Sequence, residues 1–204
     1  GGQMGAYNGW ERANWFAKNG DDTSEKSTQT WNREGPWFAR VKEECLAVNR
    51  NVGVLDLPGF SRFKIEGFDA SEFLLSKISG NLPSIGRMNL AYFPDERGRV
   101  LTEMSIMHHD VNKFTLITAG AAEWHDYEIL KSSLKKTQNV EVSDITNGLT
   151  CLIVTGPKSR DLMSRISNAD LTLPWLSLQN ATIGDKHVLL ARVSYAGELG
   201  WEIH

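Results

Sequence analysis

The chain has 204 residues, of which 41% are hydrophobic and 23% are charged, and its formal net charge is −3 at pH 7. A chain of this length and composition can bury a sizeable core, and its acidic balance gives no electrostatic basis for binding nucleic acid or an anionic membrane. No apolar run reaches the length of a membrane span and no signal-peptide pattern is present, so we expect neither a membrane segment nor secretion. The two cysteines, Cys45 and Cys151, are predicted to be buried free thiols in a reducing compartment.

The first 30 residues are predicted to form an N-terminal aromatic segment followed by a polar loop. Four of the seven tryptophans fall between Trp10 and Trp37, which favours packing of flat aromatic surface in this part of the chain. Residues 18–29 contain almost no apolar side chain, which is typical of an exposed loop.

A helix is predicted to begin at Pro36, because proline is tolerated in the first helical turn. One face of this helix is expected to be buried, since its apolar residues recur at helical spacing: Phe38, Val41, Cys45 and Val48. A second helix is predicted over residues 69–77, with Asp69 and Glu72 as a capping box and Gly80 just beyond its end.

Two strands are predicted around the turn at residues 95–98. Alternation in the second strand divides its side chains between two faces, with Val100, Met104 and Ile106 on one and Leu101, Glu103 and Ser105 on the other. A polar turn is expected at residues 108–112, followed by a strand with Phe114, Leu116 and Thr118 on one face.

The next predicted element is an amphipathic helix with an apolar face formed by Trp124, Tyr127, Leu130 and Leu134. Residues 149–155 form a continuous apolar run, which favours a fully buried strand. Gly156 and Pro157 then open a helix with Leu162, Met163 and Ile166 directed inward. These elements predict an α+β fold with mixed or antiparallel sheets and packed helices.

The last segment is predicted to be a strand, a glycine turn and a second strand, with Gly197 and Gly200 where the chain reverses. Tyr195 and Glu202 flank this turn. A carboxylate between Trp201 and Ile203 would be partly desolvated and would require hydrogen-bond donors, which a ligand with paired N–H groups supplies. A simple cross-strand pair with an exposed charge is the alternative interpretation of Tyr195 and Glu202.

No metal site is predicted. His108, His109 and Asp110 are adjacent, but neighbouring residues of a strand point to opposite faces and no third ligand is placed by the sequence. Neither cysteine has an activating neighbour in sequence, and no nucleophile-elbow motif is present.

Three stretches carry a resemblance to a known family. The segment from Tyr195 to Glu202 resembles the Tyr-x-Gly-Glu-x-Gly-x-Glu signature of the folate-binding aminomethyltransferases, the family of the glycine-cleavage T-protein. The segment from Gly9 to Phe16 resembles the Gly-Trp-Glu-Arg-x-x-Trp-Phe opening of the folate domain in dimethylglycine and sarcosine dehydrogenases. The stretch from Val52 to Asp56 is similar to the family's Val-Gly-x-x-Asp pattern.

The resemblance implies a T-protein-like folate-binding fold over residues 31–204, truncated before the C-terminal barrel of the family. It also implies two interleaved subdomains, with residues 51–140 inserted between residues 31–50 and residues 141–204. Within that fold, Glu103 matches the catalytic carboxylate, although the family normally carries Asp there. The residues that match tetrahydrofolate-binding positions are Leu90, Phe114, Leu116, Tyr195 and Glu202. Ordinary core packing is the alternative for Leu90, Phe114 and Leu116, and a solvent-facing strand residue is the alternative for Glu103.

The motifs resemble the dehydrogenase branch most, which implies one-carbon transfer from an iminium intermediate to tetrahydrofolate, giving methylene-tetrahydrofolate. The chain has no Gly-x-Gly-x-x-Gly flavin fingerprint, so FAD is expected only in a separate flavin oxidoreductase domain, in cis or in trans. The implied location is the mitochondrial matrix for a eukaryotic protein and the cytoplasm for a bacterial one. Two alternatives remain: a non-catalytic folate-binding or interaction module, and a folate-dependent enzyme that acts on another methyl donor. Relatives in iron–sulfur assembly carry a cysteine near the signature, and none lies near it in this sequence.

Overall fold

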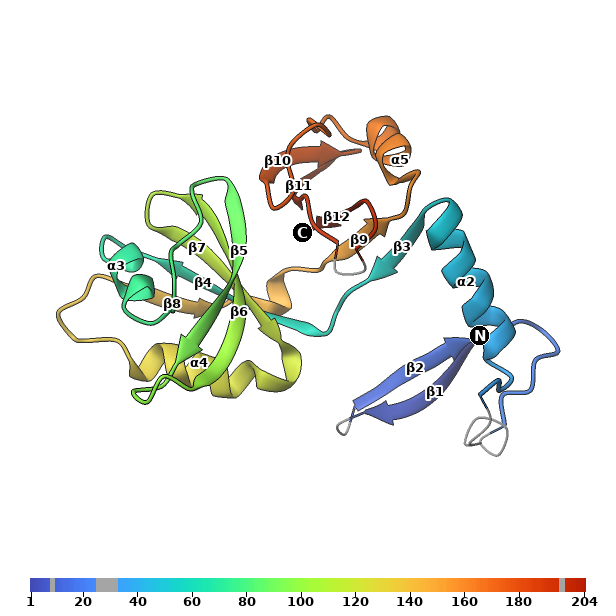
Figure 1. Cartoon of the computed structure of the whole chain (residues 1–204), viewed down its shortest axis with the longest axis horizontal. Helices are drawn as coiled ribbons and strands as arrows, with labels where there is room; N and C mark the ends of the chain where they lie inside the picture. The colour runs from blue at the N-terminus through green and yellow to red at the C-terminus, as the bar shows by residue number, and fades with distance from the viewer. Residues whose placement is uncertain (8–9, 25–32, 195–196) are drawn as a thin grey trace.

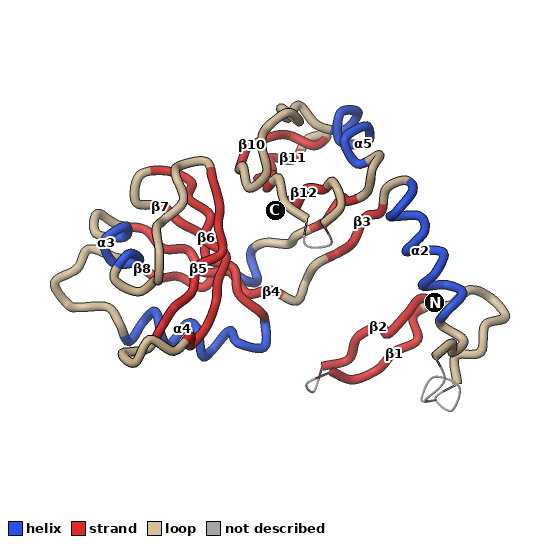
Figure 2. The backbone as a smooth tube through the Cα atoms, in the orientation of Figure 1, coloured by secondary structure: helices blue, strands red, loops and turns tan. Residues whose placement is uncertain are grey.

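The computed structural model describes residues 1–7, 10–24, 33–194 and 197–204. Figure 1 shows a hairpin and a long helix at one end of the chain's path and two separate sheets beyond them. Figure 2 shows helix α2 between the hairpin and β3, α3 and α4 against one sheet, and α5 beside the other. The architecture is therefore α+β with antiparallel sheets, as the sequence predicts.

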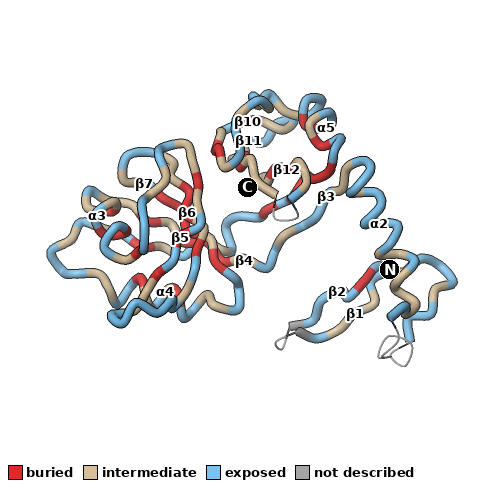
Figure 3. Tube along the Cα trace, viewed as in Figure 1, coloured by how far each residue is buried: buried red, intermediate tan, exposed pale blue. Residues whose placement is uncertain are grey.

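The N-terminal part is a hairpin followed by a helix. Strands β1 (Gly2–Tyr7) and β2 (Trp10–Phe16) pair antiparallel, and helix α2 (Phe38–Arg50) follows the polar loop. Helix α2 contains no buried residue (Figure 3), and Cys45 is exposed, so the prediction that Cys45 is buried is wrong. Its apolar stripe is only half covered because the main neighbours of α2 are β2 and β3.

The first sheet has the strand order β10-β11-β12-β9-β3, and all its pairs are antiparallel. Its strands are β3 (Gly53–Asp56), β9 (Leu152–Thr155), β10 (Leu178–Ile183), β11 (Lys186–Ala191) and β12 (Gly200–Ile203). Helix α5 (Ser159–Ile166) packs on this sheet through Met163, which joins Val154, Leu190 and Trp201 in a small core. Ile166, predicted to point inward, is 39% exposed because it lies at the end of the helix.

The second sheet has the strand order β5-β6-β7-β4-β8. Its strands are β4 (Phe60–Glu66), β5 (Arg87–Pro94), β6 (Val100–Asp110), β7 (Lys113–Ala119) and β8 (Glu141–Asp144). Helices α3 (Ala70–Leu75) and α4 (Glu123–Ser132) supply Phe73, Leu74 and Leu130 to the large core on one face of this sheet. Short 3-10 turns at Gly120–Ala122 and Thr146–Gly148 follow β7 and β8.

Side-chain alternation in β6 and β7 agrees with the sequence prediction. Met104 and Ile106 are fully buried in the large core, together with Phe114 and Leu116 of β7. Strand β6 continues through Asp110, so His108 and His109 belong to the strand and not to a turn.

Two local predictions about the helices are wrong. The Asp69 carboxylate does not cap α3; its Oδ2 accepts a hydrogen bond of 2.8 Å from the backbone N–H of Asn139 in a distant loop. Trp124 is 73% exposed, although Tyr127, Leu130 and Leu134 of the same predicted stripe contact the core. In the first turn of α4 the side chain that faces the sheet is Asp126, which is fully buried and accepts a hydrogen bond of 3.0 Å from Thr102 of β6.

The two sheets meet through a third apolar cluster. Met88 of β5 and Met107 of β6 pack against Leu178 of β10 and Ala191 of β11. The chain passes from β3 in the first sheet through all strands of the second sheet before it returns at β9. The predicted inserted subdomain covers residues 51–140, whereas the strands of the second sheet span residues 60–144. The division into subdomains stays a prediction. None of the described helices is both long and apolar enough to cross a bilayer.

Candidate functional site

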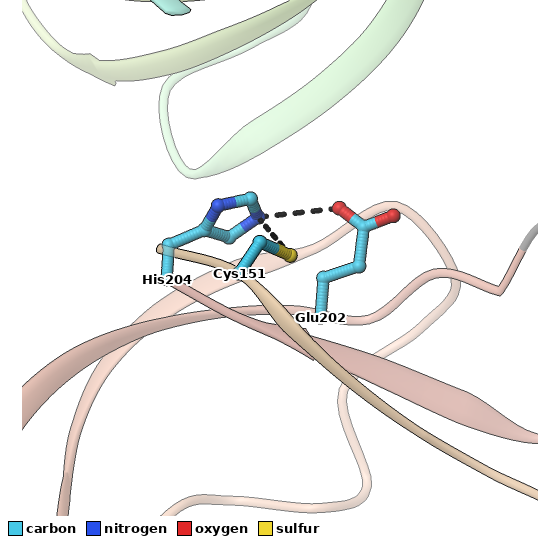
Figure 4. Close-up of side chains that lie close together, drawn as sticks. All are labelled: Cys151, Glu202 and His204. Carbon is cyan, nitrogen blue, oxygen red and sulfur yellow. Dashed lines mark hydrogen bonds and ion pairs between the residues drawn. The ribbon is translucent and has the colours of Figure 1, made fainter. Parts of the chain in front are cut away.

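Glu202 lies in β12, the central strand of the first sheet, opposite Ile153 of β9 and Ala191 of β11. Its side chain is only 15% exposed, and its Oε2 is 3.2 Å from Nε2 of His204 (Figure 4). An ionised carboxylate can only accept, so in this contact the imidazole acts as the donor when it carries its hydrogen on Nε2. Within the described part of the chain this contact engages Oε2 and leaves Oε1 available for a ligand.

Cys151 completes this group from the residue before β9. Its Sγ lies 3.9 Å from the same Nε2 of His204, and its side chain is fully buried. Burial, together with the negative charge of Glu202, raises the pKa of the Cys151 thiol to about 12, while Arg62 opposes the rise. The thiol is therefore protonated at neutral pH and is a poor nucleophile.

A pocket of about 530 Å³ opens between the two sheets, beside His204. This volume is within the range of small-molecule sites. The second sheet and the segment that leaves it contribute Arg62, Met107, His109, Thr115 and Leu149 to its wall. The first sheet contributes Asn180, Ala181, His187, Val188, Leu189 and His204.

Two polar side chains of this wall, His109 and Arg62, are largely buried. His109 Nε2 is 2.8 Å from Oγ1 of Thr115, and burial, with smaller effects of His108 and His204, lowers the pKa of His109. Arg62 is only 2% exposed; its Nη1 donates to the carbonyl of Phe60, while its buried Nε has no partner among the described residues. A buried guanidinium with an unused donor favours a ligand that carries acceptor oxygens or nitrogens.

Glu103 and Leu90 lie on the open face of strands β5 and β6. Tyr92 is opposite Glu103, and Leu90 is opposite Ser105. Leu90 is 51% exposed and Glu103 is exposed as well. Because alternate residues share a face, Glu103 is on the same side of β6 as the pocket residue Met107, about 13 Å along the strand.

Phe114 and Leu116 lie on the opposite face of the second sheet. Both are fully buried, pair with Ile65 and Phe63 of β4, and belong to the core beneath α3 and α4. The structure therefore brings Leu90 and Glu103 to one face and Glu202 to the facing sheet, but it does not bring Phe114 or Leu116 to that space. Tyr195 lies outside the described residues.

No motif or periodicity of the sequence marks Cys151 or His204 as site residues. They are 53 positions apart, and they meet because β9 and β12 pair antiparallel, with Leu152 opposite Ile203. A cysteine therefore does lie near Glu202 in space, although none lies near it in sequence.

Comparison with known proteins identifies relatives over the whole chain. The sequence matches the GCVT N-terminal domain over residues 1–204. It is 34% identical to mitochondrial dimethylglycine dehydrogenase of Rattus norvegicus over 205 residues, which cover 98% of this chain and 24% of that protein. It is 30% identical over 205 residues to the formaldehyde-forming 4-methylaminobutanoate oxidase of Paenarthrobacter nicotinovorans, with 98% of this chain and 24% of that protein covered.

A solved structure supports the fold. The glycine cleavage system aminomethyltransferase T from Bartonella henselae superimposes with a TM-score of 0.73 at 20% sequence identity, covering 100% of this chain and 49% of that one. The chain thus spans about a quarter of the two curated relatives and about half of the solved transferase.

Proposed function

The chain belongs to the GCVT N-terminal domain family, and from this premise we propose that it binds tetrahydrofolate and transfers a one-carbon unit to it. It is an aminomethyltransferase-type domain related to dimethylglycine dehydrogenases. The observation that carries the proposal is the largely buried Glu202 carboxylate, whose hydrogen-bond partner His204 lines a pocket of suitable volume. A pterin ring presents its amino and ring N–H groups side by side, and a single carboxylate can accept from both.

The residues of the pocket support this ligand chemistry. Met107, Val188 and Leu189 offer apolar surface to a flat ring, and the buried Arg62 offers a donor to ring oxygens or nitrogens. His204 restrains the Glu202 carboxylate through its hydrogen bond, so little orientation remains to be fixed when a ligand binds. Tetrahydrofolate supplies the nucleophilic nitrogen and accepts the one-carbon unit.

Glu103 has a different role in the proposal. Its carboxylate is exposed on the sheet face that continues into the pocket, where it can take up the proton released by the attacking nitrogen and stabilise positive charge on the iminium carbon. Leu90 lies on the same face and would contact the ligand ring, as would Tyr195. Phe114 and Leu116 would support the site from the core, one layer away from the ligand.

The oxidation that forms the iminium is assigned to another part of the system. We propose that FAD is bound by a flavin oxidoreductase domain, in cis or in trans, which passes an N-methyl amine-derived iminium to this domain. The similarity to a dehydrogenase four times the length of the chain supports this arrangement.

A second candidate function is a folate-binding or interaction module without transfer chemistry. The exposure of Glu103 favours it, because catalytic carboxylates act best when water is excluded. The relative from Paenarthrobacter nicotinovorans supports the same alternative, since it is a formaldehyde-forming oxidase. A transferase that acts on a different methyl donor would share the Glu202 pocket.

The test separates binding from transfer in the intact protein. Glu202→Gln is expected to weaken tetrahydrofolate binding by about 1–3 kcal/mol, because it places an amide N–H against ligand donors. Glu103→Gln is expected to bind folate nearly normally and to shift the product from methylene-tetrahydrofolate to formaldehyde, because its contribution is made in the transition state. The measurements are calorimetric folate affinity and the ratio of the two products.

Glu128→Gln is the matched control, since Glu128 is an exposed carboxylate on α4. It should leave both quantities unchanged. An unchanged product ratio in Glu103→Gln, with folate still bound, would favour the binding module. Parent-like affinity in Glu202→Gln would refute the role of this carboxylate.

A further inference from the structure

Cys151, Glu202 and His204 form a cluster of sulfur, oxygen and nitrogen donors at the edge of the pocket. Their ligand atoms all lie within 4.8 Å of one another (Figure 4). Glu202 and His204 come from β12 and the residue after it, and Cys151 comes from the residue before β9. The side chains of Glu202 and His204 are 15% and 6% exposed, and Cys151 is fully buried.

Two of the distances between these atoms are close to those between ligands of a tetrahedral zinc ion, and the third, from Cys151 Sγ to the Glu202 carboxylate, is within 4.8 Å. With a Zn–S bond of about 2.3 Å and Zn–N and Zn–O bonds of about 2.0 Å, tetrahedral angles place S and N about 3.5 Å apart and N and O about 3.3 Å apart. The observed separations are 3.9 Å from Cys151 Sγ to His204 Nε2 and 3.2 Å from that nitrogen to Glu202 Oε2. Side-chain rotation that draws the Cys151 sulfur toward the other two ligand atoms would close the coordination sphere.

The backbone already holds the three residues in place. His204 and Leu189 exchange two backbone hydrogen bonds of 2.9 and 3.0 Å, which extend the pairing of β11 beyond β12. The carbonyl of Cys151 accepts a hydrogen bond of 2.8 Å from the backbone N–H of Leu57. Strand β12 is paired on both sides at Glu202, with β11 and with β9. A site on paired strands is more precise than one on loops, so little reorganisation is needed for binding.

We propose that Cys151, Glu202 and His204 bind a divalent cation of the zinc class, with the fourth coordination position open to the pocket. The donor set suits zinc, because thiolate and imidazole select it over the hard cations magnesium and calcium. His204 lines the pocket, which gives the ion a path to the buried sulfur.

The proton balance of binding follows from the contacts. The thiol releases its proton to solvent as the metal–sulfur bond forms, and the imidazole hydrogen leaves Nε2 and is replaced by one on Nδ1. The net change is one proton released per metal ion. Thiolate and carboxylate together neutralise the dication, so the nearby Arg62 faces a neutral group and not an extra positive charge.

The sequence predicted no metal site, because it places no third ligand near its histidines. The cluster exists only in the folded sheet. This inference does not depend on the proposed function, although both use Glu202: a metal bound there and a pterin bound there exclude each other.

The experiment uses the full chain with Cys45→Ser, so that Cys151 is the single thiol. Cobalt(II) is the probe, because a cobalt–thiolate bond gives a charge-transfer absorption in the near ultraviolet. We expect one equivalent of cobalt to give this absorption, zinc to displace it, and X-ray absorption of the zinc form to show one sulfur at about 2.3 Å. Adding Cys151→Ser should abolish the absorption and weaken zinc binding by at least about tenfold.

Absence of the thiolate absorption in the folded protein would overturn the inference, as would zinc binding that Cys151→Ser leaves unchanged, which would indicate adventitious binding at other histidines. His187→Gln, which removes a pocket histidine outside the cluster, is the control and should retain the absorption.

A measurement of folate binding with and without zinc distinguishes the metal site from the proposed function. Zinc should weaken folate binding in the Cys45→Ser protein but not after Cys151→Ser is added. If folate binds to neither protein, the proposed function fails, and the cobalt spectrum still decides the metal site.

Discussion

Gly200, at the start of β12, occupies a position where a side chain has no room. A Cβ atom there would lie 2.8 Å from Cβ of Ser194 and 3.1 Å from both Oγ1 of Thr155 and the carbonyl oxygen of Val154. Ser194 and Thr155 are themselves joined by a hydroxyl contact of 3.2 Å. The signature glycine therefore allows the loop before β12 to pack against β9, which places Glu202 in the sheet.

Gly200→Ala is expected to destabilise the protein by about 1–3 kcal/mol, because two of the three close atoms belong to a paired hydroxyl and a strand carbonyl that cannot easily move. Chemical denaturation measures the loss. Gly148→Ala is the control, since no atom lies within 4 Å of its added Cβ, and it should change stability by less than about 0.5 kcal/mol. Equal stability of the two variants would contradict the packing argument.

At the scale of elements, helix α2 is held by charge and not by burial. Arg40 binds both oxygens of Asp21, with distances of 2.7 Å from Nε and 2.8 Å from Nη2, and the backbone N–H of Lys18 donates to the same carboxylate. The pair connects the loop after β2 to the first turns of α2. This ion pair supplies part of the stabilisation that α2 does not obtain from burying its apolar face.

The Arg40 hydrogen bond, followed by that of Lys18, lowers the pKa of Asp21 from 3.8 to about 2. Because the folded pKa lies below the unfolded one, Asp21 contributes stability above about pH 4, and this contribution is lost as the pH falls toward about 2. NMR titration of the Asp21 carboxyl carbon should give a midpoint near 2, and Arg40→Gln should return it toward 3.8. Arg50→Gln, in the last turn of α2, should leave the midpoint low. A parent midpoint near 3.8 would show that the pair does not persist in solution.

At the scale of the whole molecule, the contact between the two sheets decides the geometry of the candidate site. Met107 is 1% exposed and belongs both to the inter-sheet cluster and to the pocket wall. The same cluster therefore fixes the second sheet on the first and shapes the space between them.

Met107→Ala is expected to destabilise the protein by about 2–5 kcal/mol, since the substitution leaves a cavity in the apolar cluster that joins the two sheets. Met4→Ala removes a methionine that is 47% exposed in the hairpin and should change stability by less than about 0.5 kcal/mol. Urea denaturation compares the two variants. A small effect of Met107→Ala would mean that the sheets are held together elsewhere.

The sequence by itself determined most local structure. Alternation identified the buried faces of β6 and β7, and the turn residues located the reversal at residues 95–98. The apolar run at residues 149–155 contains β9, and Gly156 and Pro157 located the start of α5. These patterns depend only on residues two to four positions apart, because side chains at that spacing share one face of a strand or helix. An apolar residue at each such position indicates that the face is buried. The motifs were also sufficient to indicate the family.

Only the tertiary structure decided which of these elements face one another. Cys45 is exposed because no element in the described part of the chain covers its side of α2. The Asp69 carboxylate accepts from the distant Asn139 N–H in preference to capping its own helix. Phe114 and Glu103 lie on opposite faces of one sheet, although both match functional positions of the family. Cys151 meets His204 through strand pairing across 53 positions, which no periodicity of the sequence encodes, since register between distant strands is set by the packing of the complete sheet.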